Sequence, residues 1–233
     1  MGFLSFLART HRFFGAVSLL LIPISLYMVF VYAPTEATGH VQRIFYYHVA
    51  TAWNAFAFFA VVAVASAIYL FTRVEAWNKA ARAAGELGVL FTTLTLIAGS
   101  LWARPIWNVW WTWDPRLTTT LILWFIYVAY LLVQAAGEES SRQRRIGAIV
   151  GVVGFVDIPL VHYSAILWRS IHPVVITRES AGMPAEMFVT MILSVIAFTA
   201  LGLFLWGHRM EVEALAERVE VLKESVRAAE GWR

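Results

Sequence analysis

Cysteine is absent from this chain of 233 residues, and charged residues make up only 14% of it. The absence of cysteine excludes disulfides, thiolate metal sites and any thiol–disulfide relay carried by this chain alone. Soluble domains carry about 25% charged residues, so the scarcity of charge, together with 60% hydrophobic residues, indicates that much of the surface faces lipid. Linkers rich in proline, glycine or serine and internal repeats are absent as well, which predicts a single membrane domain.

Long apolar stretches recur along the chain, and each is long enough to cross a hydrocarbon core of about 30 Å. They are residues 13–33, the stretch between Arg43 and Arg73, and residues 87–103, 117–137, 146–168 and 187–207. We therefore predict an all-α membrane protein with six transmembrane helices, in which residues 1–207 form the membrane domain. No small-residue cleavage site follows the first stretch, so we expect a span there rather than a cleaved signal peptide.

The basic residues lie mainly in alternate connections. Most of the 18 Lys and Arg residues occur in the N-terminal segment, in residues 73–82 and 138–145, and in the C-terminal tail. Because cytoplasmic loops carry the excess of Lys and Arg, both termini are predicted to be cytoplasmic. Residues 34–45, 104–116 and 169–186 would then lie outside. The net charge of +3 is modest, and we expect no nucleic-acid partner.

The tail, residues 208–233, has a pattern of its own. Apolar residues recur at spacings of three and four, which predicts a cytoplasmic amphipathic helix. They are Val212, Leu215, Val219, Leu222 and Val226. The repeat is too short for a stable coiled coil alone. A helix lying on membrane lipid or on the protein's own loops, and a docking helix for a cytoplasmic partner, both remain open.

Tryptophan is concentrated in one predicted external segment, residues 102–118, which carries Trp102, Trp107, Trp110, Trp111 and Trp113. Tryptophans of an aromatic belt are spread around the girth of a membrane protein at the headgroup level. Because these five occur in one segment, they indicate instead a surface for a large, flat, apolar ligand.

A helical conformation would organise this segment. Spacings of three, four and seven residues would bring to one helix face Trp107, Trp110, Trp111 and Asp114. Pro105 and Pro115 would then bracket a short helix, because proline disfavours the helical conformation of the residue before it.

Asp114 and Arg116 close the tryptophan segment, and two interpretations remain open for them. They form a local ion pair at the interface, worth little if exposed. Alternatively, Arg116 binds a carboxylate of the ligand, since a guanidinium group binds carboxylates bidentately. Asp114 would then orient Arg116 or an indole N–H group.

Histidines accompany the tryptophans on the predicted external side: His40, His48, His162 and His172. A single histidine near the end of a span is more often a packing residue than a ligand. Imidazole, however, is the usual axial ligand of heme iron, and without cysteine and with few external carboxylates a Zn, Mg or Ca cage is poorly supplied. The grouping therefore favours a heme site. His11 and His208, on the cytoplasmic side, are interpreted as ordinary interfacial residues.

Asp157 is predicted to lie near the middle of the fifth span. An intramembrane carboxylate is costly and is a functional candidate by default. A protonated or hydrogen-bonded packing residue, near Asn54 or near the threonines of residues 92–95, is the alternative, and Pro159 would free backbone groups there. The sequence does not choose between these interpretations.

The segment Trp110-Trp-Thr-Trp-Asp-Pro-Arg-Leu-Thr118 resembles the "WWD" signature of the heme-handling superfamily of cytochrome c maturation. Within that superfamily, the chain is similar to the heme exporter protein C (CcmC) family over nearly its whole length. Arg43-Ile-Phe-Tyr-Tyr-His48, the tryptophan segment, and Val161-His-Tyr-Ser164 followed by His172 occur in the order of the family.

The resemblance implies that the chain takes heme b at the outer face of the bacterial cytoplasmic (inner) membrane and presents it to the periplasmic chaperone CcmE. It implies partners as well: the small membrane protein CcmD and the ABC-transporter subunits CcmA and CcmB. His48 and His172 would be the axial ligands of the heme iron, and residues 102–118 the heme platform. Arg43 and Arg116 would bind propionates, with Asp114 supporting them. His162 is not assigned to iron.

Two positions depart from the family's pattern. Asn108 stands where the family usually has glycine, so the approach of the backbone to heme is expected to differ there. Asp157 stands where related chains carry a neutral residue.

Other functions are compatible with parts of this pattern: a heme-translocating permease subunit of an ABC transporter, a heme lyase, or a scaffold that binds no heme. A permease should show a polar path, yet Asp157 is the one intramembrane acid. Lyases with this signature are usually longer. The chain would bind and orient heme while the chemistry belongs largely to the cofactor. Whether promoting heme attachment makes it an enzyme is then a matter of definition, and the description as a binding protein is favoured.

Overall fold

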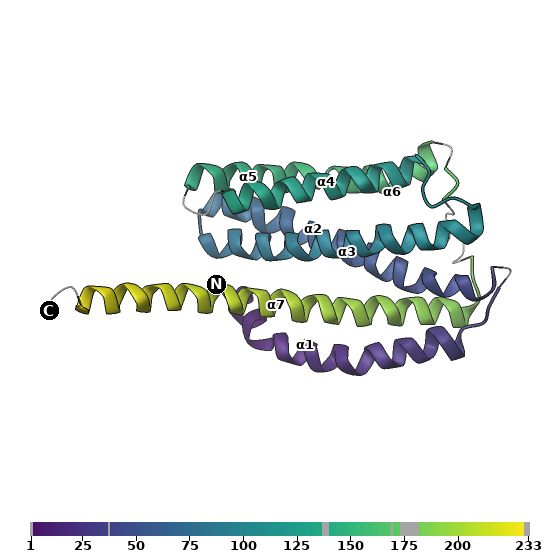
Figure 1. Ribbon diagram of the computed structural model, residues 1–233, viewed down its shortest axis with the longest axis horizontal. Helices are drawn as coiled ribbons and strands as arrows, with labels where there is room; N and C mark the ends of the chain where they lie inside the picture. The colour runs from purple at the N-terminus through teal and green to yellow at the C-terminus, as the bar shows by residue number, and fades with distance from the viewer. Residues whose placement is uncertain (1, 37, 137–139, 169, 173–181, 231–233) are drawn as a thin grey trace.

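The computed structural model describes residues 2–36, 38–136, 140–168, 170–172 and 182–230 (Figure 1). Within these ranges every regular element is helical. In chain order they are α1 (Gly2–Tyr27), a π-helical turn η1 (Met28–Tyr32), a 3₁₀ turn η2 (Gly39–Gln42), α2 (Arg43–Thr72), α3 (Glu75–Trp107), α4 (Pro115–Ala136), α5 (Ser141–Gly154), α6 (Asp157–Leu167) and α7 (Ala185–Glu230).

The prediction of an all-α membrane protein with six spans is confirmed. Six helical segments are long and apolar enough to cross a membrane: Thr10–Tyr32, Gly39–Thr72, Glu75–Trp107, Pro115–Ala136, Ser141–Leu167 and Ala185–Ala228. Every backbone polar group in the hydrocarbon must be satisfied within the protein, which is why the apolar stretches form helices. The chain is therefore a multi-pass membrane protein.

The fifth span, predicted as one helix over residues 146–168, is broken. The helix α5 ends at Gly154, α6 begins at Asp157, and the chain turns tightly through Phe155 and Val156. Glycine destabilises a helix, and Pro159 lacks the N–H group that an uninterrupted helix would need. Because α6 begins at Asp157, Pro159 lies in its first turn, where backbone N–H groups have no partner within the helix. A proline is therefore tolerated at this position.

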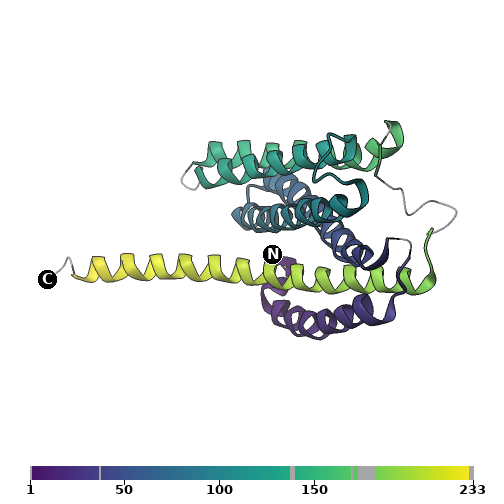
Figure 2. The same cartoon turned by 45° about the vertical axis from the view of Figure 1, so that its right-hand side comes forward.

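The helices are arranged in three groups (Figures 1 and 2). The helices α1 and α7 lie side by side, and α4, α5 and α6 lie at the opposite side of the molecule. Between them are α2 and α3, which pack against each other and also contact α7 and α4 or α5. The pair α2 and α3 is thus the centre of the bundle.

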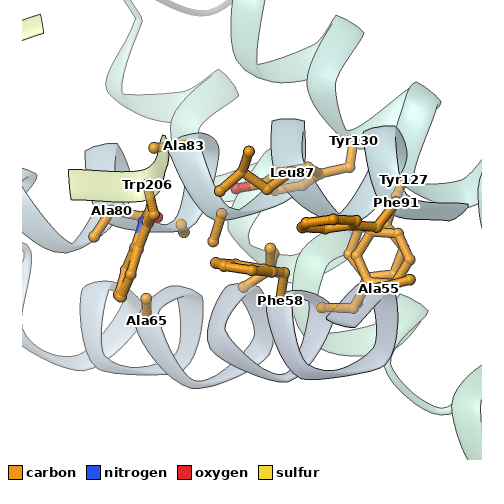
Figure 3. Close-up of a cluster of buried hydrophobic side chains, with 14 of the residues drawn as sticks. Ala55, Phe58, Ala65, Ala80, Ala83, Leu87, Phe91, Tyr127, Tyr130 and Trp206 are labelled. Atoms are coloured by element: carbon orange, nitrogen blue, oxygen red, sulfur yellow. The ribbon is translucent and has the colours of Figure 1, made fainter. Parts of the chain in front are cut away.

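The core is built by aromatic rings that lie against small residues (Figure 3). Phe59 of α2 stacks on Tyr127 of α4 with ring centroids 3.7 Å apart. A Cβ atom at Gly88 of α3 would lie 2.3 Å from Cε1 of Phe59, so only glycine leaves room for this ring. Trp206 joins α7 to the core, since its indole N–H donates to the carbonyl oxygen of Ala80 at 3.0 Å.

The predicted tail helix and the sixth span are one continuous helix, α7, which extends well beyond the bundle (Figure 1). Ion pairs hold residues 209–217 of α7 to α3: Arg209 with Glu86 at 2.7 Å, Arg82 with Glu213 at 2.8 Å, and Lys79 with Glu217. The apolar residues of the repeat are exposed, from Val212 to Val226. The tail therefore contacts the first turns of α3 through its charged side and leaves its apolar seam uncovered among the described residues.

Asp157 lies in the first turn of α6, immediately after the break. A helix N-terminus favours a negative charge, which offsets part of the cost of placing a carboxylate within a span. Of the polar side chains considered as its neighbours, Asn54 and Thr92 donate to the carbonyl oxygens of Ala50 and Gly88 in their own helices. The Oδ1 atom of Asn54 has no hydrogen-bond partner within the part of the chain that the structure describes. Asp157 Oδ2 has no hydrogen-bond partner among the described residues.

The contact between Gly88 and Phe59 gives a prediction for stability. We expect Gly88→Ala to destabilise the fold by about 1–3 kcal/mol, because the added methyl group forces the Phe59–Tyr127 stack apart. Thermal unfolding in detergent measures the effect. Leu90→Ala, at an exposed position of the same helix, is the control and should shift the midpoint much less. Equal shifts for the two variants would contradict the packing described above.

Candidate functional site

The predicted site residues gather at one end of the bundle, where α2 begins, α3 ends, α4 begins and the segment after α6 passes (Figure 1). This end carries the tryptophan segment between α3 and α4. Five of the predicted residues are linked there by contacts: His48, Trp102, Asp114, Arg116 and His172.

His48 and His172 face each other. Their ring centroids are 6.3 Å apart and their planes are inclined by 34°. Two imidazoles bound to opposite sides of one iron, with iron–nitrogen bonds of about 2 Å, have ring centroids roughly 6 Å apart. The distance between the two rings is therefore compatible with a pair of axial ligands, and the assignment that the family resemblance implies stays a prediction.

His48 is held by one face of α3. Its Nδ1 lies 3.1 Å from the carbonyl oxygen of Thr95, and Trp102 contacts its ring at a centroid distance of 6.0 Å. Between them, a Cβ atom at Gly99 would lie 3.1 Å from Cε1 of His48, so glycine allows the ring to approach the helix. A carbonyl oxygen only accepts, so Nδ1 carries the proton and Nε2 of neutral His48 is the basic nitrogen that can bind a metal.

Asp114 holds the segment that carries His172. It is buried, and its two carboxylate oxygens accept hydrogen bonds from the hydroxyl of Ser170 at 3.0 Å and from the backbone N–H of Ile171 at 2.9 Å. Oδ1 also accepts from the backbone N–H of Arg116 at 2.9 Å. Bonds to a charged acceptor are among the stronger hydrogen bonds in proteins. Asp114 therefore fastens residues 170–172 to the start of α4.

Arg116 bridges to His172 from the same turn. Its Nη1 donates to Nδ1 of His172 at 3.1 Å, and its Nη2 donates to the carbonyl oxygen of His162 at 3.0 Å. Guanidinium cannot accept, so Nδ1 is the unprotonated nitrogen of His172 and Nε2 carries the proton in the neutral ring. His48 and His172 thus differ: the basic nitrogen of His48 is available, and that of His172 is engaged by Arg116. His162 contributes its carbonyl group here, while its ring packs edge-on against Tyr163.

The helical conformation considered for the whole tryptophan segment does not form. The helix α3 continues through Pro105 to Trp107, and Asn108 ends it in the left-handed conformation with φ of 57°. Residues 109–114 are not helical, and Pro115 opens α4. Proline suits the first turn of a helix, and asparagine is second to glycine in the left-handed position that ends one. The face expected to join Trp107, Trp110, Trp111 and Asp114 does not form.

The other predicted residues lie around this centre. Trp110 and Trp113 are exposed, Trp111 contacts Trp113 edge-on with centroids 5.9 Å apart, and Arg104 lies over the Trp110 ring. Trp102 is the tryptophan that contacts His48. Arg43 lies over the ring of Phe30 at 5.3 Å, toward η1. The Nε atoms of Arg43 and Arg116 and the indole N–H of Trp102 have no hydrogen-bond partner among the described residues.

Sequence reasoning did not identify Thr95, Gly99 and Ser170 as part of the site. Thr95 and Gly99 lie seven and three residues before Trp102, on the same face of α3. Extending the helix back from Trp102 and listing the residues on its face would have indicated both as site residues. Ser170 carries no such signal, because its contact with Asp114 joins residues far apart in the chain.

Comparison with known proteins gives a consistent picture. The sequence model of the family described as "Heme exporter protein C" (CcmC) matches residues 1–225. Heme exporter protein C of Bradyrhizobium diazoefficiens is 32% identical over 223 residues, which cover 95% of this chain and 85% of the relative. That of Haemophilus influenzae is 30% identical over 207 residues, 88% of this chain and 84% of the relative. A putative cytochrome c biosynthesis ccmC-like mitochondrial protein of Arabidopsis thaliana is 29% identical over 215 residues, with coverages of 91% and 82%.

The conformation of Asn108 can be tested by substitution. Asn108→Gly should keep or slightly raise stability, because glycine adopts the left-handed conformation without a steric cost. Asn108→Val should lower stability by at least about 1–2 kcal/mol, since a β-branched residue is strained there. Thermal unfolding of both variants in detergent gives the comparison. If valine and glycine are tolerated equally, α3 does not end at this position as described.

Proposed function

The chain belongs to the heme exporter protein C family, and from that membership we propose that it binds heme b at the outer face of the cytoplasmic membrane and presents it to the chaperone CcmE. The observation that carries this proposal is the facing pair of His48 and His172, 6.3 Å apart, at the end of the bundle that bears the tryptophan segment. The coarser conclusion, a role in heme handling for cytochrome c maturation, rests on the family.

His48 is the prepared ligand in this proposal. Its hydrogen bond to the Thr95 carbonyl fixes the tautomer and the ring orientation, as the second hydrogen bond of a metal-binding histidine commonly does. Gly99 and Trp102, on one face of α3, both lie against the ring. With Nδ1 hydrogen-bonded to Thr95, His48 would hold the heme iron through Nε2.

His172 is the conditional ligand. Imidazole binds iron through an unprotonated nitrogen, and in His172 that nitrogen accepts from Arg116. Arg116 would therefore have to leave Nδ1 of His172 for that nitrogen to hold iron, and it could then bind a propionate carboxylate through two N–H groups. The Nε of Arg116, without a partner among the described residues, gives it the capacity for this contact.

The tryptophans supply the apolar surface. Trp102 contacts His48. Trp110 and Trp113, which follow Trp102 in the same segment, have exposed rings. Large exposed aromatic groups in one segment mark an interaction site. We assign Trp102, Trp107, Trp110, Trp111 and Trp113 to the heme platform and to the surface where CcmE reaches the bound heme, with Arg43 as a second propionate partner.

The membrane topology of the proposal follows from the distribution of basic residues: both termini in the cytoplasm and the histidine pair outside, in a bacterial inner membrane. Residues 1–207 would then be the membrane domain and residues 208–233 the cytoplasmic part of α7. The partners CcmD, CcmA and CcmB belong to this proposal as well.

The absorption spectrum of the purified chain, produced with ample heme, tests the ligand assignment. We expect a six-coordinate, bis-histidine spectrum in the wild type and its loss in His48→Ala and in His172→Ala, because each variant removes one axial ligand. His40→Ala, an exposed histidine of the outer segment, is the matched control and should keep the wild-type spectrum. Unchanged spectra in both ligand variants would exclude this assignment, and a wild type without heme would favour the scaffold alternative.

Removal of the Asp114 carboxylate tests whether it positions His172. Asp114→Ala takes the acceptor from Ser170 and Ile171, which costs about 1–3 kcal/mol in such buried hydrogen bonds. If this cost falls on the heme-bound state, heme affinity should fall by about tenfold or more, and the spectrum should shift toward that of His172→Ala. Glu36→Gln, an exposed acid of an outer segment, should leave heme content unchanged. Wild-type heme content and spectrum in Asp114→Ala would show that the carboxylate does not hold the ligand.

A further inference from the structure

A second group of metal-binding side chains lies far from the histidine pair, where α1 passes α7. His11 comes from α1, and His208 and Glu211 come from α7. Nε2 of His11 lies 3.2 Å from Oε2 of Glu211, and Nδ1 of His208 lies 4.0 Å from the same oxygen. The ligand atoms of all three side chains are within 4.8 Å of one another. His208 is about 35 Å of helix rise from the start of α7, where the first site lies.

We propose that His11, His208 and Glu211 bind a divalent first-row transition-metal ion of the zinc type. Two imidazoles and a carboxylate are a common ligand set for Zn²⁺, with a water molecule completing the tetrahedron. Ligand atoms around a tetrahedral zinc ion, with bonds of about 2.1 Å, are roughly 3.4 Å apart. The distances of 3.2 and 4.0 Å lie on either side of this value, so small side-chain adjustments complete the site.

One aromatic ring holds both imidazoles. Phe204 of α7 stacks with His11 at a centroid distance of 6.0 Å and with His208 at 5.9 Å. Phe204 approaches α1 because the facing residue is Gly15, where a Cβ atom would lie 2.8 Å from the ring. The two histidines are thus oriented before an ion binds, which reduces the ordering cost of binding.

Of the two carboxylate oxygens of Glu211, Oε2 is available to bind the ion. Arg12 pairs with Oε1 of Glu211 at 3.7 Å, whereas Oε2 faces the two imidazoles. The Arg12 side chain is 81% exposed and can turn away into water. His11 is buried and the side chain of His208 is 55% exposed, so an ion reaches the site from the His208 side.

A bound ion would join α1 to α7 at the level where α7 leaves the bundle. The ion would therefore stabilise the packing of α1 on α7, a role separate from the function proposed for His48 and His172. The occupant that competes with the ion is a proton: His11 and Glu211 form an ion pair when the imidazole is protonated, whereas a metal ion requires the neutral ring.

Zinc content of the full-length chain, purified without a polyhistidine tag, tests the proposal. The protein is stripped with a chelator, equilibrated with Zn²⁺ alone at low micromolar concentration, and washed. Heme content is measured in parallel. We expect about one zinc ion per chain in the wild type and in the His40→Ala control. His208→Ala and Glu211→Gln should lose it, with an affinity at least tenfold lower. His208 is exposed, so its removal leaves the fold in place.

Thermal unfolding in the same detergent provides the second readout. Zn²⁺ should raise the midpoint of the wild type, because an ion that binds only the folded chain stabilises it, and should not raise that of His208→Ala. The two chains should unfold at similar temperatures in chelator, and the heme spectrum should not change with zinc. No zinc in the wild type, or equal zinc in the wild type and in His208→Ala, would overturn the proposal and leave only the ion pair.

Discussion

The close contact between α2 and α3 determines where almost everything else lies. It is made by rings of α2 placed over glycines of α3: Phe59 over Gly88 in the core, and His48 over Gly99 at the end of the bundle. The two rings and the two glycines are each separated by eleven residues, or about three helical turns. One antiparallel register therefore satisfies both contacts. The packing of α2 on α3 that stabilises the core therefore also fixes the position of His48.

Much of the fold follows from the sequence, because a chain that crosses lipid can adopt only a few backbone structures. Six apolar stretches predict six spans, since an unpaired backbone group in hydrocarbon costs several kcal/mol. The break before Asp157 and the end of α3 at Asn108 depend on single residues whose backbone preferences compete with the apolar pattern. The apolar pattern extends across such positions. For that reason it missed the break in the fifth span, and it allowed a helix across the tryptophan segment that the structure does not have.

The sequence indicated which residue types belong to the candidate site, but not how they contact one another. Tryptophans and histidines concentrated in a few connecting segments predict a heme-binding surface, and the structure brings His48 and His172 face to face. The hydrogen bonds that organise the pair join Asp114 to Ser170 and His48 to Thr95, residues some fifty positions apart. Neither helical periodicity nor the spacing of residues along the chain predicts contacts between residues so far apart in the sequence. The group of His11, His208 and Glu211 was missed for the same reason, since α1 and α7 are the first and last helices of the chain.

The length of α7 has a mechanical consequence. Its 46 residues span about 69 Å without a break, more than twice the thickness of the hydrocarbon core. A continuous helix transmits a tilt applied at one end to the other, with the membrane as the fulcrum. A load on the exposed end would therefore rotate the part of α7 that packs on α1 and α2, and α2 carries His48. One unbroken helix therefore joins the part of α7 that packs in the bundle to its exposed tail.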